Sequence, residues 1–268
     1  MSVVRYGACD HTFVVCAYKE SPYLGECINS LVSQTRSTSI IVVTSTPNKY
    51  IESTCRRFTV PLYVGNHQSG IARDWTFGLD SVDTPLVTIA HQDDVYKPCY
   101  AERMLALINS ADRPLIYFCN YSEIRNGVEV IDNKLLRVKR TMLLPLSVDV
   151  FRSSKLIRRR ILSLGSPICC PSVTFVRPNL KEPIFTEGLK CDLDWQAWER
   201  ISRLSGEFLY DSEVGMSHRV HEGSETTALI RDDTRSKEDL FMFSQFWPSW
   251  VARILTKAYS QSQRSNSV

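Results

Sequence analysis

The N-terminal half of the chain alternates short apolar runs with amphipathic segments, and this alternation limits the folds open to it more than any other feature. The apolar runs are typical of buried strands and cover residues 12–17, 39–43, 60–64, 86–89 and 115–119. The segments between them have helical spacing and lie near residues 24–32, 50–57, 71–79 and 100–108. Strands separated by helices connect through right-handed crossovers, which predicts an α/β fold with a parallel sheet.

The second half follows a different pattern. Asn126-Gly127 between two strand-like runs predicts a β-hairpin, because both residues tolerate positive φ. The segment 137–160 is rich in Arg and Lys; a solvated amphipathic helix pair is favoured there over an anion site, and it is left without a role. Residues 235–259 carry a wide apolar stripe with a break near Pro248, and the polar residues 260–268 are expected to be disordered.

Composition narrows the functional class. A chain of 268 residues with 43% hydrophobic content can bury a full core, and a net charge of +3 does not favour nucleic acid as a partner. The N-terminus does not resemble a secretory signal, and no apolar run approaches the roughly 20 residues of a membrane-spanning helix. The nine cysteines are scattered, which favours reduced structural thiols in a cytoplasmic protein.

Two adjacent carboxylates follow one of the buried strands. Asp93 and Asp94 come directly after the run 86–90, His91 and Gln92, and so lie at the edge where parallel strands end and α/β proteins place their chemistry. Adjacent acids repel unless a cation or a proton balances their charge, which favours a divalent metal site. The competing interpretation is a helix cap or an exposed turn. Ser21-Pro22, after the first strand, are expected to cap the first helix.

Six short motifs occur in an order that resembles family 2 glycosyltransferases. They are Ala17-Tyr18-Lys19-Glu20, Val42-Val43-Thr44-Ser45, Gly70-Ile71-Ala72-Arg73-Asp74, Gln92-Asp93-Asp94, Asp194-Trp195-Gln196-Ala197-Trp198 followed by Arg200, and Arg219-Val220-His221-Glu222-Gly223-Ser224. The resemblance implies the GT-A fold, in which helices cover both faces of a Rossmann-like, mostly parallel sheet. It divides the chain into a nucleotide-sugar half (about 1–120), an acceptor half with a small antiparallel excursion (121–232) and C-terminal helices (233–259).

The resemblance also implies the binding residues. Contacts to a nucleotide sugar are expected from Ala17, Tyr18, Glu20, Ser45, Gly70, Arg73, His91, Gln92, Asp93 and Arg219. A Mn²⁺ or Mg²⁺ ion is expected at Asp93, Asp94 and His221, where it neutralises the diphosphate leaving group. Competing interpretations remain for single residues: a lone His is usually structural, and Arg73 is equally explained as an exposed surface charge.

The acceptor hydroxyl needs a base. Asp194 is the candidate and Asp192 the reserve, since Trp198 lies one turn after Asp194 and would desolvate its carboxylate. The alternative is that an acid in the first turn only complements the helix dipole.

The chain departs from the family pattern at three positions. His91 stands where the family has the first Asp of Asp-x-Asp, so fewer carboxylates or a mixed nitrogen and oxygen set would hold the metal. Thr44-Ser45-Thr46-Pro47 replaces an Asp-Gly-Ser, which removes a partner of the nucleotide base. Asp74 stands where an Asn is usual.

The resemblance implies an inverting glycosyltransferase of cell-envelope polysaccharide synthesis, with a UDP-sugar as favoured donor and a glycan or lipid-linked hydroxyl as acceptor. A sugar nucleotidyltransferase and a non-catalytic nucleotide-sugar-binding scaffold are the alternatives. Because Arg253 and Lys257 accompany the C-terminal aromatic residues, peripheral contact with the inner face of a membrane is a minority hypothesis.

Overall fold

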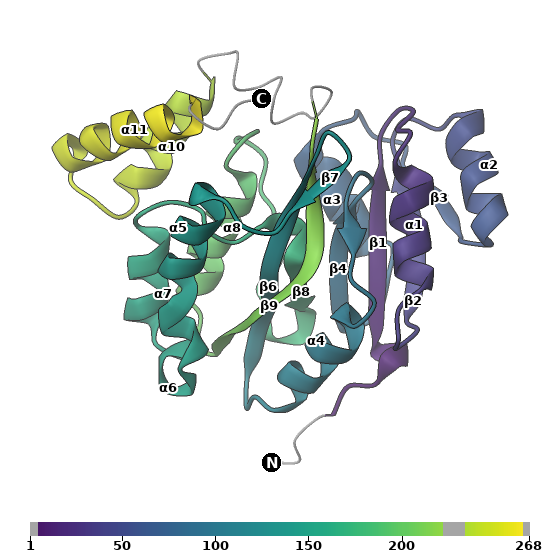
Figure 1. The fold of residues 1–268 in the computed structure, drawn as a ribbon, viewed down its shortest axis with the longest axis horizontal. Coiled ribbons are helices and arrows are strands. Elements are labelled where there is room, and N and C mark those ends of the chain that lie inside the picture. Colours follow the sequence, from purple (N-terminus) through teal and green to yellow (C-terminus); the bar gives the residue numbers. More distant parts are fainter. Residues whose placement is uncertain (1–4, 222–233, 265–268) are drawn as a thin grey trace.

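The computed structural model describes residues 5–221 and 234–264, in which nine strands form one twisted sheet (Figure 1). The strand order is β3-β2-β1-β4-β8-β6-β9-β5, and β7 pairs with β6. The strands are β1 (His11–Ala17), β2 (Ser39–Thr44), β3 (Leu62–Val64), β4 (Leu86–His91), β5 (Val95–Tyr96), β6 (Pro114–Arg125), β7 (Val128–Val130), β8 (Val173–Val176) and β9 (Glu207–Val220).

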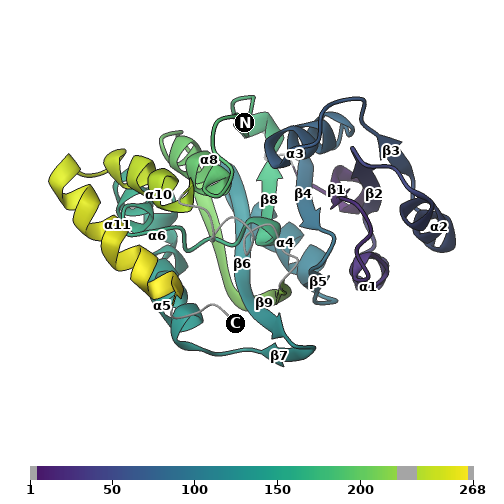
Figure 2. The ribbon, with the colours of Figure 1, turned by 90° about the horizontal axis from the view of Figure 1, so that it is seen from above.

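The predicted parallel half is confirmed. β1 pairs in parallel with β2 on one side and with β4 on the other, and Cys16 is in register with His91. The carboxyl ends of β1 and β4 therefore meet at one edge of the sheet, which Figure 2 views from above. The turn after β4 begins at this edge, next to the loop after β1.

Helices cover both faces of the sheet, as predicted. The longer ones are α1 (Leu24–Val32), α2 (Lys49–Phe58), α3 (Ile71–Asp80), α4 (Tyr100–Asn109), α5 (Lys134–Leu143), α7 (Lys155–Leu162) and α8 (Leu193–Ser202), with the short α6 (Asp149–Arg152) before α7. Side chains of β1 alternate between two cores. Phe13 packs with residues of α1, α2 and α4, and Val14 packs with residues of α3, α7 and α8.

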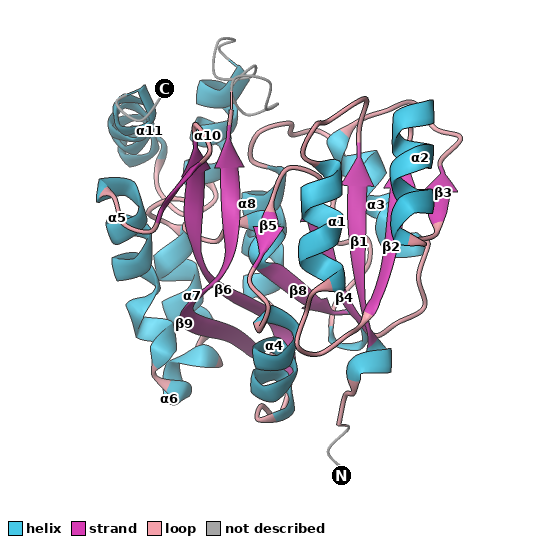
Figure 3. Cartoon of the chain, turned by 45° about the vertical axis from the view of Figure 1, so that its right-hand side comes forward, coloured by secondary structure: helices cyan, strands magenta, loops and turns pink. Residues whose placement is uncertain are grey.

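Two strands were not predicted from the sequence. β8, in the second half, lies antiparallel between β4 and β6, and the two-residue β5, in the first half, pairs antiparallel with β9. The predicted hairpin is confirmed: β6 and β7 are joined by Asn126 and Gly127, with φ of 51° and 78°. Figure 3 shows β6 and β9 as two long neighbouring strands.

The C-terminal helices are α10 (Thr234–Ser244) and α11 (Ser249–Arg264), separated near Pro248 as predicted. The expectation of a disordered tail over 260–268 was wrong for its first part, since α11 continues to Arg264; residues 265–268 lie outside the described residues. Packing of Tyr259 against Trp195 and Phe243 fixes the helix just before these polar residues.

The basic segment 137–160 lies in α5 to α7 and in the 3-10 turn Leu144–Ser147 between α5 and α6, and it is only partly solvated. Arg158 is buried and donates to the backbone oxygens of Gly206 and Leu204. All nine cysteines lie in the described ranges and are free thiols. Within those ranges, none of the helices combines the length and the apolar character that a membrane span requires.

Candidate active site

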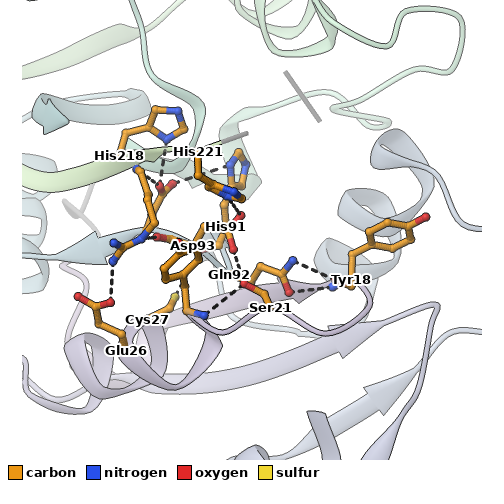
Figure 4. A network of polar contacts seen from close by, with 12 residues as sticks. Tyr18, Ser21, Glu26, Cys27, His91, Gln92, Asp93, His218 and His221 are labelled. Carbon is orange, nitrogen blue, oxygen red and sulfur yellow. Dashed lines mark hydrogen bonds and ion pairs between the residues drawn. The ribbon is translucent and has the colours of Figure 1, made fainter. Parts of the chain in front are cut away.

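Asp93 lies at the centre of a polar network at the carboxyl edge of β1 and β4 (Figure 4). Its Oδ1 accepts a hydrogen bond of 2.5 Å from Ser21 Oγ, and its Oδ2 lies 3.1 Å from His221 Nε2. The side chain of Asp93 is 23% exposed. A carboxylate, an imidazole and a hydroxyl from three distant segments therefore meet at a position open to solvent.

Asp94 lies in the same turn but makes a different set of contacts. It is fully buried, and its Oδ1 contacts His218 Nδ1 and the Arg219 N–H, each at 2.9 Å. Burial raises the pKa of Asp94, but His218 and the Arg219 N–H outweigh it, so that its pKa lies below the ordinary value. Asp94 therefore joins the β4 turn to β9, and Asp93 is the member of the pair with exposed surface.

Arg219 reaches the network from the end of β9. Its Nε donates to the backbone oxygen of Asp93 at 2.9 Å, and its Nη2 donates to Glu26 Oε2 at 2.6 Å. The guanidinium carbon lies 4.1 Å from the ring centroid of Tyr23. These contacts hold the cation beside Asp93.

The loop after β1 is tied to the same turn. The Gln92 side chain accepts from the Tyr18 N–H and donates to the Tyr18 carbonyl, both at 3.0 Å. Ala17 is buried at the end of β1, Glu20 is exposed, and the partly buried residue Ser45 follows β2. Among the described residues, Ser45 Oγ has no hydrogen-bond partner.

Arg73 and Gly70 lie at the start of α3. Gly70 is exposed and precedes the helix. Arg73 donates from Nε and Nη2 to the two carboxylate oxygens of Glu187, at 2.9 and 2.8 Å. Arg73 thus bridges α3 to the loop before α8, and it is not part of the Asp93 network that the hydrogen bonds define.

Aromatic contacts join the end of β4 to α8. His91 stacks on Trp75 with ring centroids 5.2 Å apart, and Trp75 meets Phe185 edge-on at 4.8 Å. Phe175 then contacts both Phe185 and Trp198, at 5.7 and 5.8 Å. His91 therefore packs in an aromatic row, and burial lowers its pKa.

Asp194 is in the first turn of α8. Burial raises its pKa to about 6, although the Trp195 N–H donates to its Oδ1 at 2.7 Å. Burial raises the pKa of the adjacent thiols Cys169 and Cys170, and the charges of Asp94 and Asp194 raise it further.

Asp192, the reserve base, is buried against α10. Burial and the neighbouring Asp239 raise the pKa of Asp192 well above its ordinary value, and burial raises that of Asp239 to about 6. Both side chains are buried, and among the described residues neither carboxylate oxygen of Asp239 has a hydrogen-bond partner. The positive charge of Arg235 lowers the pKa of both carboxyl groups by less than burial raises it.

Three residues of the network were missed in the sequence. Ser21 was expected to cap a helix, but α1 begins at Leu24 with Tyr23 at its N-cap, and the Ser21 hydroxyl instead binds Asp93. Tyr23 and Glu26 were assigned no role, yet they hold Arg219. The sequence contains little sign of the role of Ser21, because a Ser-Pro pair before a helix is equally typical of a helix cap.

The donor set at Asp93 fits a hard divalent cation. Carboxylate oxygen, imidazole nitrogen and hydroxyl oxygen are ligands that Mn²⁺ accepts, and open coordination positions suit diphosphate oxygens and water. Among the described residues, no group of three or more His, Cys, Asp or Glu side chains forms a complete site. An ion at Asp93 would depend on oxygens from its substrate.

Comparison with solved structures defines the class of fold. TarS of S. aureus in complex with UDP-GlcNAc superposes with a TM-score of 0.63 at 16% identity, over 88% of this chain and 71% of that chain. The mannosyltransferase PcManGT of Pyrobaculum calidifontis, in complex with GDP-Man and Mn²⁺, gives 0.62 at 14% identity, over 100% of this chain and 79% of that chain. The fold is the GT-A fold of glycosyltransferases.

Sequence comparison identifies the family. Residues 12–180, more than half of the chain, match the family described as Glycosyl transferase family 2, and the chain belongs to that family. It is 26% identical over 236 residues to an uncharacterized glycosyltransferase of Rickettsia prowazekii, covering 86% of this chain and 70% of that protein. It is also similar to one of Rickettsia conorii, with 25% identity over 78% of this chain and 34% of that protein.

Proposed function

We propose that the chain transfers a sugar from a nucleotide diphosphate sugar to an acceptor hydroxyl with inversion at the anomeric carbon. The observation that carries this proposal is the Asp93 network: a solvent-accessible carboxylate with His221 and the anchored cation Arg219 beside it, at the edge where β1 and β4 end. Positive charge stabilises an anionic diphosphate. Arg219 supplies one such charge, and a metal ion held by the Asp93 carboxylate would supply another.

The metal belongs to this proposal. Asp93 and His221 would hold Mn²⁺ or Mg²⁺, with Asp94 fixing the turn through His218 and Arg219. The ion, when bound, supplies positive charge that stabilises the departing diphosphate. Arg219 orients the diphosphate next to Asp93, and its contact with the Tyr23 ring keeps the guanidinium in place before the donor binds.

Asp194 is proposed as the base. As the acceptor oxygen bonds to the anomeric carbon, the bond from that carbon to the diphosphate oxygen breaks and the acceptor proton passes to the Asp194 carboxylate. A pKa of about 6 makes Asp194 a stronger base than an exposed aspartate while leaving it ionised at neutral pH. A single displacement of this kind inverts the configuration.

We propose a UDP-sugar as donor and a glycan or lipid-linked hydroxyl as acceptor, in cytoplasmic assembly of an envelope polysaccharide. TarS was solved with UDP-GlcNAc and PcManGT with GDP-Man, so a uridine donor is favoured by one similar structure and a guanosine donor by the other.

The first test is a thermal-shift panel of UDP- and GDP-sugars with and without Mn²⁺. We expect the wild type to gain several degrees only when donor and Mn²⁺ are present together, and Asp93→Asn to lose that gain. Asp80→Asn is the matched control, since Asp80 is an exposed aspartate at the end of α3. Full Mn²⁺-dependent stabilisation of Asp93→Asn would remove Asp93 from the metal site.

Donor hydrolysis without acceptor separates the alternatives. A transferase releases sugar to water slowly, a nucleotidyltransferase requires a nucleoside triphosphate, and a binding scaffold does neither.

We further propose that α11 rests on an anionic membrane surface. Trp250 and Ile254 are 68% and 61% exposed on one face of the helix, and Arg253 and Lys257 are exposed on the same face. An apolar stripe with flanking cations and no acidic residue in α11 matches an interface of acyl chains and anionic headgroups.

A further inference from the structure

Glu238 of α10 binds three successive backbone N–H groups at the start of α8. Its carboxylate accepts from Lys190 N at 2.9 Å, from Cys191 N at 2.7 Å and from Asp192 N at 3.1 Å. The side chain of Glu238 is buried, and it lies 46 to 48 residues away in the sequence from the groups it binds. A single carboxylate thus fixes the whole turn that leads into the helix.

Helix α8 does not hold this turn through its own N-cap. Asp192 occupies the N-cap of α8, and among the described residues it makes no side-chain capping bond. Orphan N–H groups at a buried helix start are costly to leave unpaired. Glu238 satisfies the groups just ahead of the helix, and its negative charge also complements the positive end of the helix dipole.

The rest of α10 is anchored firmly enough for Glu238 to act as a fixed point. Phe243 contacts the Trp195 ring edge-on at 5.0 Å, and Met242 and Phe243 are buried in the same core as Trp195. Asp194, the proposed base, is two residues after the last N–H group that Glu238 binds.

We propose that Glu238 is a positioning residue for Asp194, so that the C-terminal helix α10 is a working part of the catalytic site although it lies outside the matched residues 12–180. This inference rests on the proposed function, in which Asp194 takes the acceptor proton. Because a shift of the base by about 1 Å can cost about a hundredfold in rate, loosening this turn should affect the chemical step more than donor binding.

The test compares Glu238→Ala and Glu238→Gln with the wild type in a steady-state transfer assay. We expect Glu238→Ala to lower kcat by about tenfold to a hundredfold with the donor KM changed by less than about twofold. Glu238→Gln keeps an oxygen that accepts from the N–H groups and should recover part of kcat. Amide hydrogen exchange at residues 190–192 should accelerate in Glu238→Ala.

Glu199→Gln is the matched control, because Glu199 is a buried glutamate at the other end of α8, held by Arg159 and Arg203. It should lower Tm and leave kcat unchanged. Wild-type kcat in Glu238→Ala, equal kcat losses in Glu238→Ala and Glu199→Gln, or unchanged exchange at 190–192 would each overturn the inference. A wild type that neither binds nor transfers any donor would count against the proposed function instead, and exchange at 190–192 would still decide whether Glu238 holds this turn.

Discussion

The two arginines expected to contact the nucleotide sugar, Arg73 and Arg219, differ in how firmly their present partners hold them. Arg219 is 8% exposed and has the Asp93 carbonyl, Glu26 and the Tyr23 ring around it. The side chains of Arg73 and Glu187 are 40% and 64% exposed. Exposed ion pairs contribute little stability, so a diphosphate could displace Glu187 from Arg73 far more easily than it could displace the partners of Arg219.

Replacing Glu187 by Gln should therefore strengthen donor binding. The variant removes an anion that competes for Arg73, and we expect the donor Kd measured by calorimetry with Mn²⁺ present to fall by about twofold to fivefold. Asp132→Asn is the control, since it removes the charged partner of Arg137 in another exposed Arg–carboxylate pair. A donor Kd that rises, or that moves equally in both variants, contradicts a role of Arg73 at the phosphates.

For single residues, the sequence predicted which side chains belong to the site better than it predicted which residues they contact. Asp93, His221 and Arg219 were expected together, and the structure brings them into one network. Neither Glu26 nor Ser21 was expected there, because the packing of α1 against the β4 turn is a tertiary contact that no local pattern encodes. The sequence also did not predict that Asp94 is buried while Asp93 is partly exposed. The two residues are identical and adjacent, and only tertiary contacts distinguish their environments.

At the level of elements, the contact between α8 and α10 contains two buried carboxyl groups, Asp192 and Asp239, whose charges repel. The pKa values of Asp192 and Asp239 are both raised, so the folded protein binds protons here that the unfolded chain releases. Stability from this contact is complete below the ordinary aspartate pKa near 4 and is lost as pH rises through about 6 and above. Arg235, Glu238 and Asp194 are the other charged groups close by.

Thermal unfolding from pH 5 to pH 8 measures this contribution. We expect the wild-type Tm to fall over this interval and the Tm of Asp192→Asn to fall less, because the variant lacks one of the two buried carboxyl groups that must lose a proton as the pH rises. Parallel Tm curves for the two proteins would show that the pair does not govern the pH dependence.

Elements with a strong local period were predicted, and those defined by their neighbours were not. The helix expected over 71–79 is α3, and the turn chemistry of Asn126-Gly127 gave the β6–β7 hairpin. β5 has two residues and exists only because it pairs with β9. β8 is a four-residue apolar strand whose antiparallel direction depends on β4 and β6, which precede it by many residues.

For the whole molecule, the position of α11 leads to a prediction about where the protein resides. The helix lies on the outside of the fold, beside α10 (Figure 2). We expect full-length protein to sediment with vesicles containing phosphatidylglycerol and not with pure phosphatidylcholine vesicles, because both the apolar stripe and the cations contribute.

The double variant Trp250→Ser with Ile254→Ser should stay in the supernatant. The control pairs Val148→Ser with Val150→Ser, since these side chains are 50% and 70% exposed near α6 and leave α11 intact. Equal sedimentation of all three proteins would remove the membrane contact from the proposal.

The place of β8 in the sheet has a consequence for synthesis of the chain. β8 inserts between β4 and β6, although both leave the ribosome long before residues 173–176. Until then the nascent polypeptide carries a free hydrogen-bonding edge on β4 and on β6, the kind of edge that recruits strands from other molecules. A translational pause before this point would prolong the aggregation-prone stage, and early release there would give a product that cannot close its sheet.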